Sequence, residues 1–140
     1  TATVPSEEEE VACLESGDVV VANSGSDALT VFKADGTFKS VPFYVSSATD
    51  NLAGLAWKAD TEEVLVAVDG VDRVLALSPE DCANRVFILD PNLTGVSIRS
   101  LTQLASGDVL VVEANNVERF GTNGNRVTAG WPMALQTGAT

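Results

Sequence analysis

The chain contains no histidine, only two cysteines and only eight lysine and arginine residues. The absence of histidine excludes the Ser-His and Cys-His nucleophile pairs and every imidazole ligand to a metal. Two cysteines are too few for a dense disulfide framework or for a four-thiolate zinc site. They leave one bridge, within or between chains, or two buried thiols.

Twenty Asp and Glu residues give the chain a formal net charge of -12. Such a charge repels phosphate groups, which argues against nucleic acid and anionic lipid surfaces as partners. No apolar run approaches the roughly 18 to 20 residues of a membrane span. The 140 residues, 45% of them hydrophobic, suit one domain with a packed core. Because the first residue is Thr, we expect a processed mature protein or an excerpt from a longer chain.

The sequence repeats itself with a period of about 45 residues. Residues 14–19 and 104–109 share Leu, Ser, Gly, Asp and Val in the same order, and residues 22–32 and 67–77 share Ala, Gly and Asp. Val19, Val64 and Val109 fall in one frame. The period therefore predicts that these three valines occupy equivalent, buried positions in the second strand of three successive units.

Each unit reads as four short strands, because apolar residues alternate between turn signals. The expected strands are 10–15, 18–23, 28–33 and 37–44 in the first unit; 52–58, 63–68, 73–78 and 85–90 in the second; and 98–105, 108–114, 117–121 and 126–132 in the third. Asp35-Gly36 and Asn123-Gly124 favour tight hairpins. No segment sustains a 3.6-residue period, so we expect almost no helix.

Four-stranded units of this length are typical of β-propeller blades. The run at 20–38, VVANSGSDALTVFKADGTF, resembles the second to fourth strands of NHL-type blades. The resemblance implies an all-β fold of three antiparallel blades at about 10–46, 50–92 and 96–135, between an acidic segment at 1–9 and a tail at 136–140. Known closed propellers need at least four blades. We therefore expect another subunit, or further blades, to complete the ring.

NHL-like propellers include enzymes, and the resemblance implies lactone hydrolysis or metal-dependent lyase chemistry as alternatives. The lyase relatives bind their metal through His, which this chain lacks. The lactonase-like relatives hold a divalent ion with Glu, Asn and Asp near the axis. The residues here that match such a calcium site are Asn23, Asp27, Asp69 and Asp72. The same residue types are ordinary in tight turns, so a purely structural role stays open.

Three further features bear on modification and partners. Cys13 is expected in an inner strand and Cys82 in an outer turn, too far apart for a bridge within the chain, so they bridge two subunits or stay free. Asn92 begins the glycosylation sequon Asn-Leu-Thr. The acidic run at 7–10 meets a basic partner or is a solvated terminus.

Four aromatic residues could line a ligand surface or pack between blades: Trp57, Trp131, Phe43 and Tyr44. Taken together, the sequence favours a non-enzymatic, secreted or extracellular propeller module for structural assembly or recognition. It needs no cofactor, with calcium as the one exception left open. The alternatives are a calcium-dependent hydrolase, half of a larger propeller, and the subunit of an extracellular filament. The expected partner is a second copy of the chain, or a protein that supplies the remaining blades.

Overall fold

The computed structural model describes residues 9–23, 28–39, 44–45, 52–69, 73–80, 83–88 and 97–135. Every named element in these ranges is a β-strand, as the alternating pattern predicts. Among the described residues, no helix is long and apolar enough to cross a membrane.

The strands form three antiparallel sheets that follow one another along the chain. The first sheet contains β1 (Glu9–Cys13), β2 (Val19–Asn23), β3 (Ala28–Phe32) and β4 (Tyr44–Val45). The middle sheet contains β5 (Leu52–Lys58), β6 (Glu63–Val68), β7 (Arg73–Leu77) and β8 (Asn84–Ile88). The third sheet contains β9 (Ile98–Gln103), β10 (Val109–Glu113), β11 (Asn116–Phe120) and β12 (Arg126–Val127), and β13 (Met133–Ala134) also pairs with β11.

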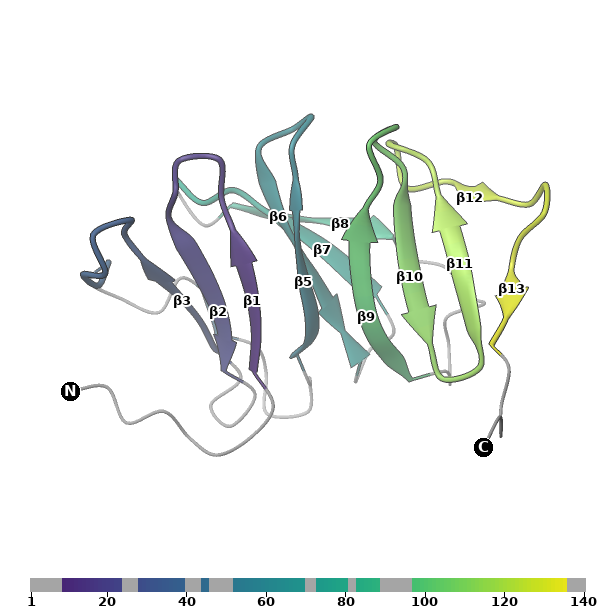
Figure 1. Ribbon diagram of the computed structural model, residues 1–140, viewed down its shortest axis with the longest axis horizontal. Helices are drawn as coiled ribbons and strands as arrows, with labels where there is room; N and C mark the ends of the chain where they lie inside the picture. Colours follow the sequence, from purple (N-terminus) through teal and green to yellow (C-terminus); the bar gives the residue numbers. More distant parts are fainter. Residues whose placement is uncertain are drawn as a thin grey trace.

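The three sheets stand side by side with the middle sheet between the other two, as Figure 1 shows. The first strand of each sheet lies next to the first strand of its neighbour, so that β5 contacts both β1 and β9. The middle sheet therefore presents one face to the first sheet and the other face to the third sheet.

The strand registers confirm the repeat. Val19 pairs with Phe32 in β3, Val64 pairs with Leu77 in β7, and Val109 pairs with Phe120 in β11. The three valines are thus equivalent positions in the second strand of each sheet, as the period predicts.

Tight turns with a glycine in the left-handed region join the first two strands of the outer sheets. Gly17 has a φ of 86° and Gly107 a φ of 91°, and each donates its N–H to a leucine carbonyl three residues earlier. A Cβ at either position would be strained, which explains the repeated Ser-Gly-Asp sequence.

Two apolar layers hold the sheets together. Val64, Val66 and Val68 of β6 face the first sheet and are fully buried against its Val20 and Leu29. The alternate residues of β6 form the second layer, where Leu65 and Ala67 pack against Val109, Val111 and Phe120 of the third sheet. A strand buried on both faces needs a continuous apolar run, which is the sequence of β6.

The outward faces of the first and third sheets have no described sheet against them. Val19 is only half-buried, whereas Val64 and Val109 are completely buried. The expectation that all three are buried is therefore wrong for Val19, because its face points away from the middle sheet. On the same outer face, Val11 is 55% exposed.

Two expected strands differ from those observed. Of the expected strand 126–132 only β12 forms, and β13 begins after it at Met133, since Gly130 takes a φ of 80° and proline at 132 cannot donate to a ladder. The expected strand 37–44 contributes a single bridge from Phe38 to Phe32 and the pairing of Tyr44 in β4, while residues 40–43 lie outside the described ranges.

Val64→Ala and Val19→Ala compare the same truncation at equivalent positions. We expect Val64→Ala to lower the free energy of unfolding by about 2 kcal/mol, since it opens a cavity between two sheets. Val19→Ala should cost less than about half as much at low protein concentration, because solvent already reaches that face. Urea denaturation followed by circular dichroism gives both values, and equal losses would contradict the packing described above.

Candidate functional site

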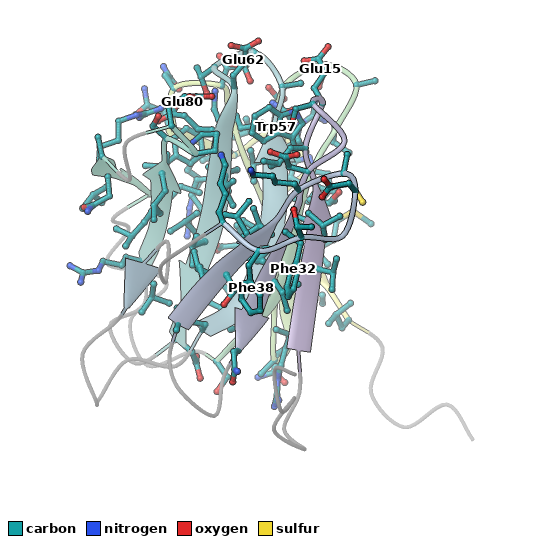
Figure 2. The ribbon with its side chains drawn as sticks, turned by 90° about the vertical axis from the view of Figure 1, so that its left-hand side faces the viewer. Glu15, Phe32, Phe38, Trp57, Glu62 and Glu80 are labelled. Carbon is teal, nitrogen blue, oxygen red and sulfur yellow. The ribbon has the colours of Figure 1, made fainter. Side chains whose placement is uncertain are left out.

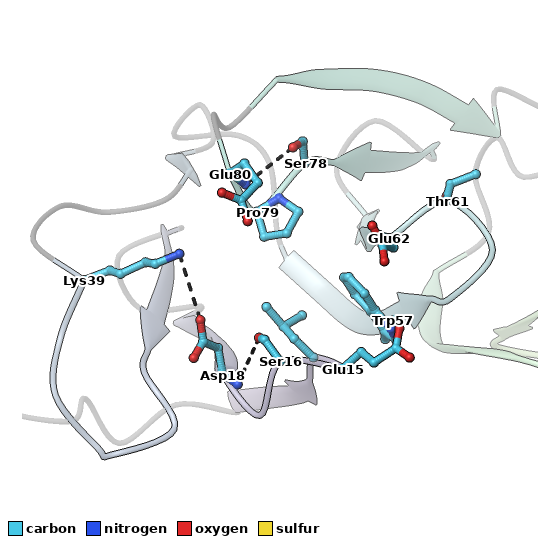
Figure 3. A pocket seen from close by; sticks show the side chains of 11 residues that line it. Glu15, Ser16, Asp18, Lys39, Trp57, Thr61, Glu62, Ser78, Pro79 and Glu80 are labelled. Carbon is cyan, nitrogen blue, oxygen red and sulfur yellow. Dashed lines mark hydrogen bonds and ion pairs between the residues drawn. The ribbon is translucent and has the colours of Figure 1, made fainter.

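A cleft of about 480 Å³ opens between the first and middle sheets, at the end of the molecule where β1 turns into β2. We call it the Trp57 cleft. The turn after β1, the turn between β5 and β6 and the segment after β7 form its walls (Figure 3). Its lining residues are Leu14, Glu15, Ser16, Asp18, Lys39, Trp57, Thr61, Glu62, Ser78, Pro79 and Glu80.

Trp57 is the aromatic centre of this cleft. It lies in β5 opposite Val64 and packs on the apolar layer between the first and middle sheets. It thus packs between sheets, as one of its two expected roles requires, and it also lines the cleft. Its Nε1 atom is buried and has no hydrogen-bond partner in the structure. The ring lies between the labelled side chains of Glu15 and Glu62 in Figure 3.

The cleft is strongly acidic. Glu15, Glu62 and Glu80 are exposed, and no hydrogen bond or ion pair within the described part of the chain engages their carboxylates. The one cation of the lining, Lys39, lies 4.0 Å from Asp18. Oδ1 of Asp18 also accepts a hydrogen bond from the Ala34 N–H, so Asp18 is committed within its own sheet.

Glu62 occupies a position that the equivalent turns give to glycine. It directly precedes Glu63 and Val64, as Gly17 precedes Asp18 and Val19. Its φ is 54°, and it is the only non-glycine with positive φ among the described residues. The left-handed conformation is unfavourable for a residue with a Cβ by about 1–2 kcal/mol, so the carboxylate is held at the rim of the cleft against a backbone cost.

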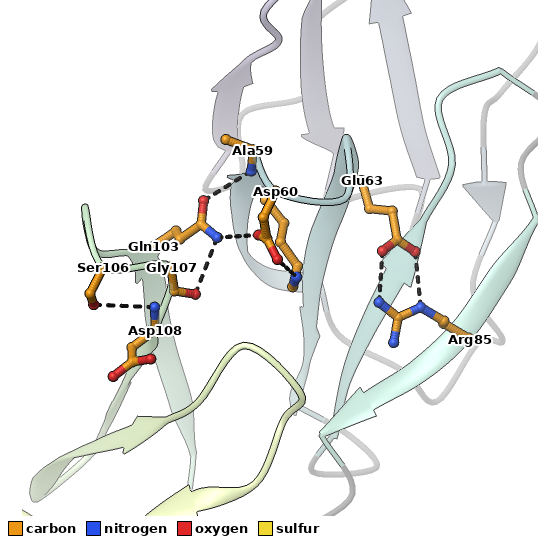
Figure 4. Close-up of polar contacts among 9 residues, drawn as sticks. Ala59, Asp60, Glu63, Arg85, Gln103, Ser106, Gly107 and Asp108 are labelled. Carbon is orange, nitrogen blue, oxygen red and sulfur yellow. Dashed lines mark hydrogen bonds and ion pairs between the residues drawn. The ribbon is translucent and has the colours of Figure 1, made fainter.

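The matching notch between the middle and third sheets is instead lined by a polar network (Figure 4). Gln103 of β9 occupies the register position of Trp57, since it pairs with Val109 as Trp57 pairs with Val64. Its Oε1 accepts the N–H of Ala59 at 2.9 Å, and its Nε2 donates to Asp60 Oδ1 at 2.6 Å. These two hydrogen bonds connect the third sheet to the middle sheet.

Lys58 completes this network from inside the molecule. Its side chain is fully buried, its Nζ pairs with Asp60, and the same atom lies 5.4 Å from the centre of the Phe87 ring. Burial opposes ionisation of Asp60, but the hydrogen bonds from Lys58 and Gln103 prevail and hold its pKa below the ordinary value. The sequence period aligns Ala59, not Lys58, with Leu14 and Leu104. Only the strand register, in which Lys58 pairs with Glu63, places the lysine at the position of these leucines.

Solved structures share this arrangement of sheets, although no protein-family model and no curated protein sequence matches the chain. Virginiamycin B lyase from Staphylococcus aureus matches with a TM-score of 0.65 at 15% identity, over 84% of this chain and 39% of the lyase. A chain of a nidogen/laminin complex matches with a TM-score of 0.69 at 14% identity, over 84% of this chain and 46% of its own. YCF48 bound to D1 peptide matches with a TM-score of 0.64 at 12% identity, over 89% and 39%.

These structures are β-propeller proteins. The chain has a β-propeller fold. It spans less than half the length of each of the three structures that it matches. The likeness extends to the fold alone, since the sequence identities lie between 12% and 15%.

The residues predicted to hold calcium are only partly described. Asn23 ends β2 with a buried Oδ1 that has no partner, and Asp69 follows β6 with its Oδ1 accepting the N–H of Ile98 at 2.9 Å. Asp27 and Asp72 lie outside the described residues. Over the described ranges no group of three or more His, Cys, Asp or Glu side chains is placed to hold a metal. The calcium site therefore stays a prediction from the sequence.

The predicted modification sites are also only partly described. Cys13 is an exposed free thiol at the end of β1, while Cys82 and Asn92 lie outside the described residues. An intersubunit bridge and glycosylation at Asn92 thus remain predictions.

Of the predicted aromatic residues, Trp131 has its ring centre 6.0 Å from the guanidinium carbon of Arg119. Phe43 lies outside the described residues, and Tyr44 pairs with Leu29 across β3 and β4.

Sequence reasoning did not single out a buried pair of glutamates in the third sheet. Glu113 is 1% exposed and Glu118 is 4% exposed, on the face that packs against the middle sheet. Asn116 donates to Glu113 at 3.0 Å, and Arg126 donates to Glu118 at 2.8 Å. Burial and the charge of Glu118 raise the pKa of Glu113 to about 7.

Glu113 therefore makes stability depend on pH. Because the pKa of Glu113 is about 7 in the folded chain and about 4.5 for an ordinary glutamate in water, the folded state binds more protons between these values. The contribution of Glu113 to the unfolding free energy falls as pH rises through this window and is constant above it. We expect the difference in unfolding free energy between the unmodified chain and Glu113→Gln to change in this direction. Urea titrations from mildly acidic to mildly alkaline pH measure it, and a pH-independent difference would show that Glu113 is ionised throughout.

Proposed function

We propose that each of the three sheets is a propeller blade and that the chain is a non-catalytic, extracellular module, which completes its ring by pairing with a second copy and recognises proteins. One observation carries the assembly part of this proposal. Equivalent apolar positions are buried where a neighbouring blade covers them and half-exposed where none does, as at Val64 and Val19. The two end blades thus retain faces that are built for a neighbour.

The outer face of the first blade carries exposed apolar side chains. Val11 is 55% exposed and Phe38 is 53% exposed, and the ring of Phe38 lies 4.9 Å from that of Phe32. Both phenylalanines are visible on the face that Figure 2 turns toward the viewer. Apolar side chains gathered on one face mark an interaction surface when they are not covered.

The outer face of the third blade corresponds to the face of the middle blade that carries Leu65. Leu65 is completely buried by the third blade, whereas the equivalent Leu110 is only partly buried. On this same face, Met133 pairs with Val117 and is 54% exposed. The surface therefore has the residue types of a blade interface but lacks the covering blade among the described residues.

The interfaces inside the chain show how such faces fit together. At both interfaces, the Val64-type face of one blade packs on the Leu65-type face of the blade before it. The first blade of a second copy can therefore cover the third blade of the first copy. When the third blade of each copy is covered by the first blade of the other copy, the two copies form a closed ring of six blades. This agrees with the length of the matched propeller chains, of which this chain spans 39% to 46%.

The recognition part of the proposal is supported by the propellers that share the fold. One is solved in a nidogen/laminin complex and another is bound to D1 peptide. The acidic Trp57 cleft gives this chain a concave surface on which a partner could bind.

Native mass spectrometry of the purified chain tests the assembly. We expect twice the 14.6 kDa monomer mass at micromolar concentration, because pairing hides both apolar faces. Val11→Asp places a charge on the outer face of the first blade and should yield monomers. Val86→Asp is the matched control, since Val86 is 45% exposed but lies on the middle blade, and it should leave the dimer intact.

The remaining outcomes are equally informative. A series of higher oligomer masses that Val11→Asp abolishes would show that the same contact builds an open filament rather than a closed ring. A folded monomer at high micromolar concentration would contradict pairing of this chain with itself. Dissociation by both variants alike would show that the contact does not use the outer face of the first blade.

A further inference from the structure

We propose that the Trp57 cleft binds the guanidinium group of an arginine side chain in a basic peptide segment of a partner protein. The inference rests on the recognition role proposed above. It does not rest on dimer formation, because the first and middle blades alone build the cleft. Three observations lead to this ligand.

The first observation is an imbalance of charge. Several other turn carboxylates of the described chain pair with the chain's own cations, as Glu63 does with Arg85 and Asp108 does with Arg119. Asp35 and Asp69 have no such ion pair there, but each accepts a hydrogen bond within the chain. Around the Trp57 cleft, Glu15, Glu62 and Glu80 have no such partner in the described residues. An external cation is the group that would complete this surface.

The second observation is the choice of residue at position 62. Gly17 and Gly107 take the left-handed conformation at the last position of the corresponding turns, where glycine adopts it at no cost. The turn between β5 and β6 is one residue longer, since Trp57 and Val64 are seven positions apart where Cys13 and Val19 are six apart. Glu62 adopts it with a Cβ and places a carboxylate on the rim of the cleft. The fold alone therefore does not explain this glutamate, whereas a ligand of opposite charge does.

The third observation is the contrast between two equivalent notches of similar size, about 480 Å³ and about 450 Å³. In the second notch, Gln103 spans the two blades and satisfies Ala59 and Asp60. In the first, the equivalent position holds Trp57, which makes no such bond and has a buried Nε1 without an acceptor. The first notch has an aromatic surface and free carboxylates where the second has completed hydrogen bonds.

These groups match arginine better than other cations. A guanidinium is planar, so it stacks on an indole ring while its fork of N–H groups donates to carboxylates. Trp57 lies between Glu15 and Glu62, as Figure 3 shows, and so offers both kinds of contact to one side chain. Lysine would keep the charge but lose the stacked, bidentate geometry.

Trp57 itself can report on binding. The chain has two tryptophans, so the Trp131→Phe background leaves Trp57 as the single indole fluorophore. The probe is a short, uncharged peptide with one central arginine, compared with the same peptide carrying citrulline, which has the same shape without the charge. We expect the arginine peptide to change Trp57 fluorescence and to bind at least about tenfold more tightly than the citrulline peptide.

The decisive variant is Glu62→Gly. It removes a rim carboxylate and gives the turn the residue that its conformation prefers, so we expect unchanged or higher stability together with affinity lower by about fivefold or more. Glu15→Gln and Glu80→Gln should also weaken binding. Glu7→Gln removes the same unit of charge from the acidic N-terminal run and should change affinity by less than about twofold.

Three outcomes would contradict the proposal. Equal affinity for the arginine and citrulline peptides would exclude guanidinium recognition. Equal losses for Glu62→Gly and Glu7→Gln would show only general attraction to an acidic chain. Free arginine that binds as tightly as the peptide would make the ligand a small cation rather than a protein segment. Retained peptide binding by a chain that native mass spectrometry shows to be monomeric would separate this inference from the assembly.

Discussion

The middle sheet is apolar on both of its faces, and the rest of the structure depends on covering it. Val64, Leu65, Val66, Ala67 and Val68 are all completely buried, a run in which successive side chains point to opposite faces. One face requires the first blade and the other requires the third. The same packing rule, applied to the outer blades, leaves each with one face covered and one face open.

Polar groups decide how the blades are held at their ends. The residue before each of the three equivalent valines is a carboxylate, and each pairs with a cation of its own sheet. These residues are Asp18, Glu63 and Asp108. Between the middle and third blades, Lys58, Asp60 and Gln103 add a bridge that crosses the interface. Between the first and middle blades, Trp57 replaces this bridge, and an acidic cleft results.

The repeat made most of the fold predictable from the sequence. The equivalence of Val19, Val64 and Val109 follows from one period, and Gly17 and Gly107 mark turns that only a left-handed residue closes. The exposure of Val19 was missed because a period states which positions correspond but not which of them has a neighbouring blade. A single strand at 126–132 was expected because its apolar residues alternate, although Gly130 interrupts it.

The candidate site was much less accessible from the sequence. The acidic and amide residues considered there lie near the ends of second strands, such as Asn23 and Asp69, where turn residues and ligands look alike. The cleft instead combines Glu15, Trp57 and Glu80 from three separate segments, and only the packing of two blades brings them together. The burial of Lys58 and of the pair Glu113 and Glu118 likewise arises from contacts between strands.

Thiol labelling of Cys13 tests most directly whether the open blade face is an interface. Cys13 is an exposed free thiol opposite Val19 on the outer face of the first blade, and Cys82→Ser leaves it as the only thiol in the chain. A covering blade predicts that its labelling by a small maleimide slows as protein concentration rises. A thiol introduced by Val86→Cys, in a chain that also carries Cys13→Ser and Cys82→Ser, should react at a constant rate. Rapid labelling of Cys13 at every concentration would contradict the account.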